Sequence, residues 1–180
     1  MILHLVRHPR PVVPADTCYG RLDVAAEGVE AAAERLRALL PAGLPVWTSP
    51  LTRCRALAEC LHPAPVVDGR LAEMDFGEWE GRTWQDIGPA ALDAWAEDVA
   101  GFTFPGGESA WILQRRALAC VAEIAVGEAV LVTHAGVLRM LLAHWLGLEP
   151  EAWLRLTFPY GTATTVDLAA TGGTVLHLNR

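Results

Sequence analysis

The sequence predicts a three-layer α/β/α fold, in which helices cover both faces of a mostly parallel sheet with an antiparallel margin. Short apolar runs typical of buried strands alternate with longer segments whose apolar residues recur at helical spacing. A strand–turn–strand pattern near the end of the chain adds the antiparallel part. With 180 residues, 52% of them hydrophobic and 19% charged, the chain can bury one sizeable core.

The first third of the chain predicts two strands, two helices and a long loop. Residues 2–6 are a continuous apolar run, which indicates a buried strand, and residues 9–24 are rich in proline and glycine, which indicates a loop. Residues 25–40 combine alanine with charges at helical spacing and predict a helix. Residues 46–48 predict the second strand. Residues 49–61 predict the second helix, with the serine at its start as N-cap.

The middle of the chain predicts short elements separated by loops. Residues 65–67 predict a short strand, and residues 75–82 predict a loop. Residues 84–100 predict one or two helices, because a glycine–proline pair interrupts the pattern. Residues 102–107 predict a second loop, and residues 109–125 predict a helix.

The last third predicts a strand, a helix and a hairpin. Residues 129–132 are apolar and predict a buried strand, and residues 137–146 predict the helix behind it. Residues 162–168 and 174–178 predict two antiparallel strands around a turn at residues 171–173.

The whole chain is expected to form a single domain spanning residues 1–180. It contains no internal repeat and no stretch with the composition of a linker. Residues 77–107 interrupt the alternation of strands and helices. We therefore regard this segment as a candidate cap on the domain.

The composition excludes several kinds of chemistry. The net charge of −7 argues against nucleic-acid binding, because a polyanion requires a clustered basic face. All 14 basic residues are arginine, so the lysine of a P-loop or of a Schiff-base enzyme is missing. A phosphate site remains compatible with this composition, because a guanidinium group binds two phosphate oxygens at once.

The cysteines and the apolar segments predict a cytoplasmic protein. Cys18, Cys54, Cys60 and Cys120 show no C-x-x-C spacing, which favours reduced thiols over a zinc cluster. The chain opens on a strand pattern without a basic segment, so no signal peptide is expected. Residues 129–148 carry charged and polar side chains and favour a strand and a helix over a membrane span. The oligomeric state stays open, with a homodimer among the options.

Polar side chains occur where three of the expected strands end. Arg7 and His8 follow the first strand. Arg53 lies one turn into the helix after the second strand, and His134 follows the strand at residues 129–132. Ligands of open α/β sheets bind beyond the carboxyl ends of the strands, so these groups are expected on one rim. The helix N-termini there also favour an anion.

This set of residues suits phosphoryl transfer. Arginine stabilises the charge on the phosphoryl oxygens, and a neutral imidazole can attack phosphorus to form a covalent intermediate that water cleaves. The leaving alkoxide needs a proton. Glu73, expected at the end of a short strand just before a loop, is the best candidate for the acid. Glu78 and Glu80 could rival it, but in a loop they are expected to be solvated.

Five motifs make a family resemblance specific. They occupy residues 5–8 (LVRH), 49–56 (SPLTRCRA), 73–81 (EMDFGEWEG), 106–109 (GGES, followed by Arg116) and 132–136 (VTHAG). In this order they resemble the signature of the histidine phosphatase superfamily, also called phosphoglycerate mutase-like. The resemblance covers most of the chain and implies the phosphoglycerate mutase-like fold.

Each role in the family's chemistry is carried over by position. The resemblance implies that His8 is the nucleophile and Glu73 the proton donor. It implies that Arg7, Arg53 and His134 hold the phosphoryl group, with His134 also taking part in catalysis. It implies no metal and no organic cofactor. The expected partner is a small phosphorylated metabolite, with neither a nucleic acid nor a membrane.

The first loop narrows the resemblance. Residues 7–11 (RHPRP) and 17–24 (TCYGRLDV) are similar to α-ribazole phosphatases of cobalamin biosynthesis. This loop holds the weaker candidates for substrate binding, namely Arg10, Tyr19, Gly20 and Arg21. A minority interpretation is that Tyr19 or a tryptophan of the candidate cap stacks on an aromatic ring of the substrate.

One residue departs from the family pattern. The family usually has glycine after the histidine, and this chain has Pro9. Proline donates no N–H, but its carbonyl can accept the N–H of His8 Nδ1 and leave Nε2 free to attack. The substitution argues against a phosphoglycerate mutase.

Three other polar residues are expected to be structural. His4 lies too far along the strand from His8 to share a metal with it, and we expect it to be packed or hydrogen-bonded. Arg55 points away from Arg53 on the helix and is expected in a surface ion pair. Arg116 is expected to pair with a loop carboxylate.

The sequence thus predicts a hydrolase, a phosphomonoesterase of the histidine acid phosphatase type. The favoured substrate is α-ribazole 5′-phosphate. Another small-molecule histidine phosphatase or a mutase-like enzyme is the alternative. A catalytically silent phosphate-binding domain is the weakest alternative, because both the nucleophile and the acid are present.

Overall fold

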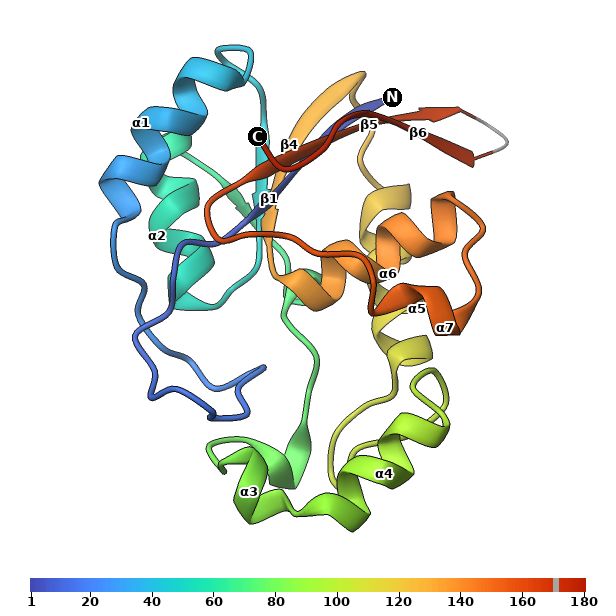
Figure 1. Cartoon of the computed structure of the whole chain (residues 1–180). Helices are drawn as coiled ribbons and strands as arrows, with labels where there is room; N and C mark the ends of the chain where they lie inside the picture. Colours follow the sequence, from blue (N-terminus) through green and yellow to red (C-terminus); the bar gives the residue numbers. More distant parts are fainter. Residues whose placement is uncertain (170–171) are drawn as a thin grey trace.

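The computed structural model describes residues 1–169 and 172–180. Within these residues a six-stranded sheet has the strand order β3-β2-β4-β1-β5-β6 (Figure 1). Its strands are β1 (Ile2–Arg7), β2 (Val46–Thr48), β3 (Val66–Val67), β4 (Glu128–Thr133), β5 (Ala163–Ala169) and β6 (Gly172–His177). The first four pair in parallel, whereas β5 and β6 are antiparallel. The predicted fold is confirmed, including its antiparallel margin.

Helices cover both faces of this sheet (Figure 1). On one side lie α1 (Val29–Leu39) and α2 (Thr52–Leu61). On the other lie α5 (Ala110–Ala122) and α6 (Ala135–Trp145), with α7 (Pro150–Trp153) packed on α6. The sequence pattern does not predict α7, because four residues are too few to show a helical period.

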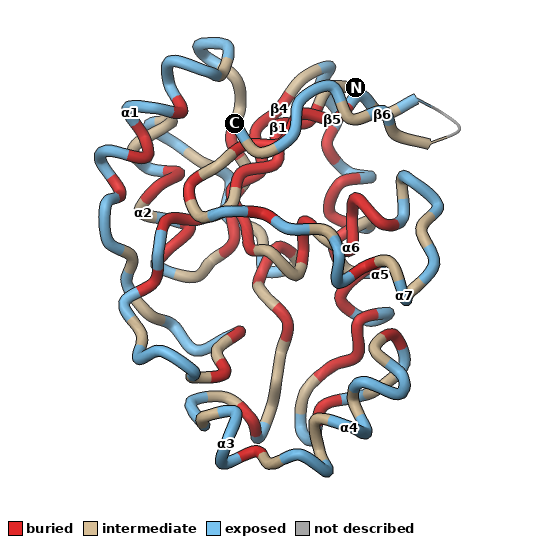
Figure 2. Tube along the Cα trace, in the orientation of Figure 1, coloured by how far each residue is buried: buried red, intermediate tan, exposed pale blue. Residues whose placement is uncertain are grey.

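The two central strands are buried on both faces. In β1, Leu3 and Leu5 pack with residues of α5 and α6, whereas Val6 packs with residues of α1 and α2. In β4, Leu131 packs with residues of α5 and α6, whereas Val132 packs with residues of α1 and α2. This alternation follows from the two-residue period of a strand between two helical layers. Figure 2 shows buried residues concentrated along these strands.

Residues 77–107 lie apart from the sheet, at the bottom of Figure 1. They contain a 3₁₀ turn (Gly77–Trp79), α3 (Trp84–Ile87) and α4 (Pro89–Glu97). The two helices are separated by Gly88, whose φ of 87° an L-residue rarely adopts. The predicted interruption is therefore confirmed, while the interpretation of the segment as a cap stays a prediction.

The first helix begins four residues later than predicted. Ala25 and Ala26 continue the loop, because Ala26 bridges to Pro11 and the carbonyl of Ala25 accepts the N–H of Val12 at 2.9 Å. Gly28 then turns the chain with a φ of 68°, and α1 starts at the next residue. The alanine-rich composition gave no sign of this pairing.

The second helix also begins later than predicted, at Thr52 instead of residue 49. Its N-cap is Leu51, so the expected serine cap is wrong. The hydroxyl of Ser49 accepts the N–H of Leu51 at 3.2 Å and contacts His134 at 2.7 Å, and so it serves the site described below. The predicted turn at residues 171–173 lies partly outside the described residues.

Candidate active site

The carboxyl ends of β1 and β4 lie side by side and bring two histidines together. Arg7 and Thr133 are register partners, and the backbone N–H of His8 donates to the carbonyl of Thr133 at 3.0 Å. His134 follows Thr133, so the imidazole rings of His8 and His134 pack with their centroids 5.1 Å apart. The parallel register therefore explains why residues far apart in the sequence meet at one rim.

His8 is only 2% exposed, and one hydrogen bond fixes its ring. Nδ1 lies 2.6 Å from the carbonyl oxygen of Pro9, as expected from the sequence. Because a carbonyl can only accept, Nδ1 carries the proton and Nε2 keeps its lone pair. Burial, reinforced by the charge of Arg53, lowers the pKa of His8 to about 3. The imidazole is therefore neutral near pH 7.

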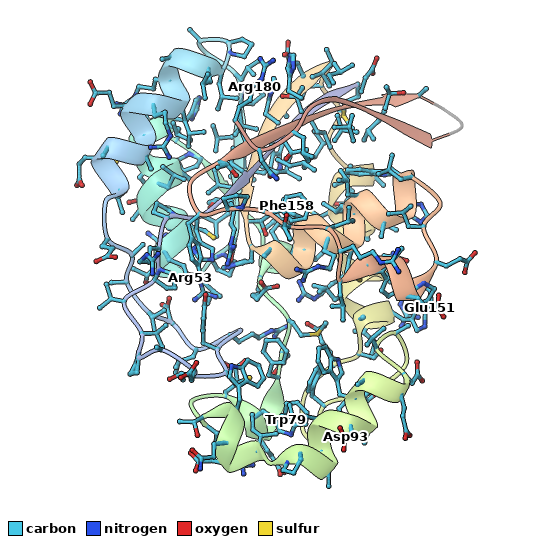
Figure 3. The ribbon with its side chains drawn as sticks, viewed as in Figure 1. Arg53, Trp79, Asp93, Glu151, Phe158 and Arg180 are labelled. Atoms are coloured by element: carbon cyan, nitrogen blue, oxygen red, sulfur yellow. The ribbon has the colours of Figure 1, made fainter. Side chains whose placement is uncertain are left out.

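Two arginines flank the histidines. Arg53 is fully buried and donates to the carbonyls of Gly20 at 2.5 Å and Leu22 at 2.9 Å. Figure 3 shows it beside α2, toward the first loop. Arg7 donates to the carbonyl of Phe158 at 2.5 Å. Within the described residues, the buried Nε atoms of both arginines have no acceptor, so each keeps an unused donor.

His134 is fully buried behind His8. Its Nε2 lies 2.7 Å from the hydroxyl of Ser49 and 3.4 Å from the sulfur of Cys54. Burial, followed by the nearby His8 and Arg53, lowers the pKa of His134 well below its ordinary value. Neutral imidazoles and cationic guanidiniums thus share one small region. We call these four residues the histidine–arginine cluster: Arg7, His8, Arg53 and His134.

The carboxylate of Glu73 lies at the N-terminus of α6. It accepts the backbone N–H of Gly136 at 3.0 Å and that of Met74 at 2.9 Å. A Cβ at position 136 would approach Glu73 Oε1 to 2.2 Å, so glycine there makes room for the carboxylate. Glu73 does not end a strand as expected, because β3 stops at Val67 and a 3₁₀ turn (Gly69–Leu71) intervenes.

Arg116 holds the segment of Glu73 in place. Its guanidinium donates to the carbonyl of Glu73 at 2.9 Å, and to those of Ala72 at 2.7 Å and Arg70 at 2.6 Å. The same group pairs with Glu108 at 2.6 Å. The expected pairing of Arg116 with a loop carboxylate is confirmed, and the carboxylate is that of Glu108.

A cavity of about 210 Å³ opens beside His8 and Glu73. Its polar lining includes Arg7, Tyr19 and Arg139, whereas Arg53 and His134 lie behind its wall. Aromatic side chains form much of the remaining lining, and we call this part the aromatic end: Phe76, Trp84, Trp95, Phe104 and Trp153. Two of its tryptophans come from α3 and α4, so the segment below the sheet forms one wall.

The weaker candidates of the first loop have different surroundings. Tyr19 lines the cavity, and the carbonyl of Gly20 serves Arg53. Arg10 and Arg21 do not line the cavity, and their side chains are 70% and 43% exposed. Both lie near carboxylates at 3.6 to 3.7 Å: Glu27 for Arg10, and Asp75 and Glu108 for Arg21.

Glu80 is not solvated as predicted. Its carboxylate accepts four backbone N–H groups at 2.8 to 3.1 Å: those of Gly20, Arg21, Leu22 and Phe76. It thereby fixes the first loop, including the carbonyls that Arg53 contacts. Nothing in the sequence separates this internal carboxylate from the exposed Glu78, because most of the N–H groups come from residues about 60 positions away.

Tyr160 and Arg139 belong to the site, although the sequence analysis does not select them. The guanidinium of Arg7 stacks over the ring of Tyr160 at 3.7 Å, and no motif marks this position. Arg139 lines the cavity and donates to the carbonyl of Leu156 at 3.3 Å. Its place shortly after His134, near the start of the next helix, is a signal that could have identified it.

The residues expected to be structural are so. His4 is hydrogen-bonded to Thr165 at 3.0 Å and to Glu128 at 2.9 Å. Arg55 forms an exposed ion pair with Glu59 at 3.0 Å. These contacts account for both side chains without a ligand.

Two further observations on the described part of the chain concern metal binding and membrane insertion. Residues 1–169 and 172–180 contain no group of three or more histidine, cysteine or acidic side chains that could hold a metal ion. All four cysteines are free. No helix among these residues is both long and apolar enough to cross a membrane.

The fold and the histidine–arginine cluster define the phosphoglycerate mutase-like class of phosphatases. The chain belongs to the histidine phosphatase superfamily (branch 1), whose family model matches residues 3–180. It is 33% identical over 165 residues to the glucosyl-3-phosphoglycerate phosphatase of Mycolicibacterium vanbaalenii, in a match that covers 82% of this chain and 72% of the relative. The chain is therefore a phosphomonoesterase of this superfamily.

Solved structures resemble the whole chain. TTHB049 from Thermus thermophilus has a TM-score of 0.81 and 34% identity, over 100% of this chain and 99% of that one. A putative alpha-ribazole-5′-P phosphatase from Escherichia coli K-12 has a TM-score of 0.87 and 25% identity, over 100% of this chain and 96% of that one. The expected phosphoglycerate mutase-like fold is confirmed by these similarities.

Proposed function

We propose that this phosphatase hydrolyses a small phosphomonoester through a phosphohistidine at His8. The observation that carries the proposal is the state of that imidazole. Its Nδ1–H is held by Pro9, its Nε2 is unprotonated, and it lines a cavity that also contains the carboxyl of Glu73. A neutral nucleophile and a candidate proton donor on one cavity are what this two-step chemistry requires.

In the first step, Nε2 of His8 forms a bond to phosphorus as the bond to the leaving oxygen breaks. Glu73 donates a proton to the leaving alkoxide and becomes a carboxylate. In the second step, water attacks the phosphohistidine, its proton passes to the Glu73 carboxylate, and inorganic phosphate leaves with His8 neutral again. The charge on the phosphoryl oxygens is stabilised by Arg7 and Arg53, with His134 as a hydrogen-bond partner.

We propose α-ribazole 5′-phosphate, an intermediate of cobalamin biosynthesis, as the favoured substrate. The first loop resembles that branch, and the similarity to the putative enzyme from Escherichia coli supports it. The aromatic end of the cavity supports it as well, because tryptophan and phenylalanine rings can stack on a benzimidazole. A glucosyl or fructosyl group has many hydroxyl groups that need hydrogen-bonding partners, and the aromatic residues at this end supply few of them.

We further propose that residues 77–107 act as a cap, because Trp84 and Trp95 of this segment line the cavity. The free cysteines and the small-metabolite substrate support a cytoplasmic location.

The test begins with hydrolysis of an aryl phosphate without added metal, from acidic to neutral pH. Protein quenched in alkaline denaturant, where phosphohistidine is stable, should carry label from radiolabelled substrate on His8. His8→Ala should lose both turnover and label, while exposed His144→Ala keeps them. Absence of turnover in the wild type would favour a silent phosphate-binding domain.

A second experiment tests the substrate. The values of kcat/KM are compared for ribazole phosphate, glucosyl-phosphoglycerate, fructose bisphosphate and phosphoglycerate, and the absence of a preference for ribazole phosphate removes the cobalamin assignment.

A further inference from the structure

The chain contains two tyrosines, and they meet at the site. Tyr19 comes from the first loop and Tyr160 from the segment between α7 and β5. Their hydroxyl groups lie 2.9 Å apart, within hydrogen-bond distance. Two loops that lie far apart in the sequence are thus joined by one side-chain contact at the edge of the cavity.

Each tyrosine also lies over a different arginine of the histidine–arginine cluster. The Arg7 guanidinium carbon lies 3.7 Å from the ring centroid of Tyr160, and that of Arg53 lies 5.4 Å from the centroid of Tyr19. Both distances fall within the range of a cation–π contact. The ring of Tyr160 also packs 5.6 Å from that of His8. The hydroxyl contact therefore completes a chain Arg7–Tyr160–Tyr19–Arg53.

The two arginines need such support to different degrees. Arg53 is held by two backbone carbonyls, whereas Arg7 has one, that of Phe158. The two cations also repel each other when no anion lies between them. The negative face of an aromatic ring offsets part of this repulsion and fixes the plane of the guanidinium. Burial and the contact with Tyr160 raise the pKa of Tyr19, so its hydroxyl stays uncharged near neutral pH.

We infer that Tyr19 and Tyr160 are positioning residues that hold Arg7 and Arg53 at the spacing that binds a phosphoryl group. This inference rests on the proposed function, because it assigns a phosphoryl group to the two arginines. Tyr160 contributes more to this positioning than Tyr19, since its ring lies closer to Arg7 than the ring of Tyr19 lies to Arg53. The hydroxyl contact adds a smaller share by fixing both rings together.

The readout is the dissociation constant of inorganic phosphate, measured by calorimetry on the folded full chain. Tyr160→Leu should weaken phosphate binding about 5- to 20-fold, because it removes the stack. Tyr160→Trp should stay within about twofold of the wild type, because indole offers an equal or better face. Tyr19→Phe and Tyr160→Phe should each weaken binding about twofold, and the double variant no more than either single one, because both remove the same contact.

The control Trp145→Leu removes a half-buried aromatic ring at the far end of α6, and it should leave the phosphate constant unchanged. Rescue by tryptophan but not by leucine identifies the aromatic face, which general loss of packing would not do. A Tyr160→Leu variant that binds phosphate like the wild type overturns this inference alone. A wild type that binds no phosphate and hydrolyses no aryl phosphate overturns the proposed function with it.

Discussion

The two ends of the cavity are built in different ways. The histidine–arginine cluster grows from the ends of β1 and β4 and from the first turn of α2, and Arg53 and His134 are fully buried. The aromatic end is assembled from α3, α4, α7 and loops, and Trp84 is 40% exposed. One end is fixed by the register of the sheet, and the other by short helices and loops outside the sheet.

This difference separates chemistry from selectivity. Charged groups that must meet within a few ångströms are placed by the most rigid part of the fold, where small errors would cost rate. The groups proposed to contact the rest of the substrate come from short helices and loops outside the sheet, and such surface segments tolerate change. Substitutions at the first end should therefore alter kcat with every substrate, whereas substitutions at the second should alter KM with some.

The largest effect is expected for Glu73→Gln, which tests the boundary between the two ends. The rate of phosphoenzyme formation from an alkyl phosphate should fall about 10²- to 10⁴-fold, because the leaving alkoxide loses its proton donor. The rate with 4-nitrophenyl phosphate should fall much less, because nitrophenolate leaves without a proton. Single-turnover labelling measures both. Exposed Glu78→Gln is the control, and an equal loss with both substrates would contradict the role as acid.

Gly136→Ala should produce the next largest effect, through the position of Glu73 alone. The added methyl would stand 2.2 Å from Glu73 Oε1, so the carboxylate must move away from the N–H of Gly136. We expect kcat to fall about 10- to 100-fold. The melting temperature should not fall, because alanine is the better helix former by up to about 1 kcal/mol.

The matched control is Gly69→Ala, where an added Cβ meets nothing within 4 Å. It should change neither kcat nor stability appreciably. If the loss of kcat in Gly136→Ala only matched a loss of folded protein, the close approach of the Glu73 carboxylate to α6 would not be required for activity.

The four residues of the histidine–arginine cluster could be predicted from the sequence, whereas the side chains that support them could not. Arg7 ends β1 and His8 follows it, so the direction of both side chains is set by local chain geometry, and a motif marks them. Tyr160 and Glu80 act on groups far away in the sequence through loops whose paths no local pattern reveals. The late start of α2 also results from a contact that is distant in the sequence, because the hydroxyl of Ser49 contacts His134.

Acidic pH should destabilise the folded protein through the buried histidines of the histidine–arginine cluster. For each of them, the equilibrium constant of unfolding should rise about tenfold for each unit by which the pH falls. Above pH 6.5, the ordinary pKa of histidine, His8 is neutral in both states and contributes nothing. Between pH 6.5 and its folded pKa of about 3, the unfolded chain binds a proton that folded His8 refuses. The free energy of unfolding therefore falls by about 1.4 kcal/mol per unit as pH drops.

Urea unfolding from neutral pH down to about pH 5.5 measures this slope, above the range where most carboxylates titrate. His8→Asn should make this slope shallower. Asparagine is chosen because its amide can still donate a hydrogen bond to the Pro9 carbonyl. Exposed His144→Asn should leave it unchanged. An unaltered slope in His8→Asn would mean that the folded protein admits the proton.

The smallest effect is expected for Trp84→Ala, which tests the aromatic end alone. Removing one partly exposed ring should raise KM for 1-naphthyl phosphate about fivefold, because a stacked ring pair is worth about 1 kcal/mol. KM for glycerol phosphate and kcat for both substrates should hardly change, since the ring lies at the aromatic end of the cavity. Trp145→Ala, at the far end of α6, controls for loss of an indole. Equal changes for both substrates would show that α3 shapes the whole cavity, and the separation of chemistry from selectivity would then fail.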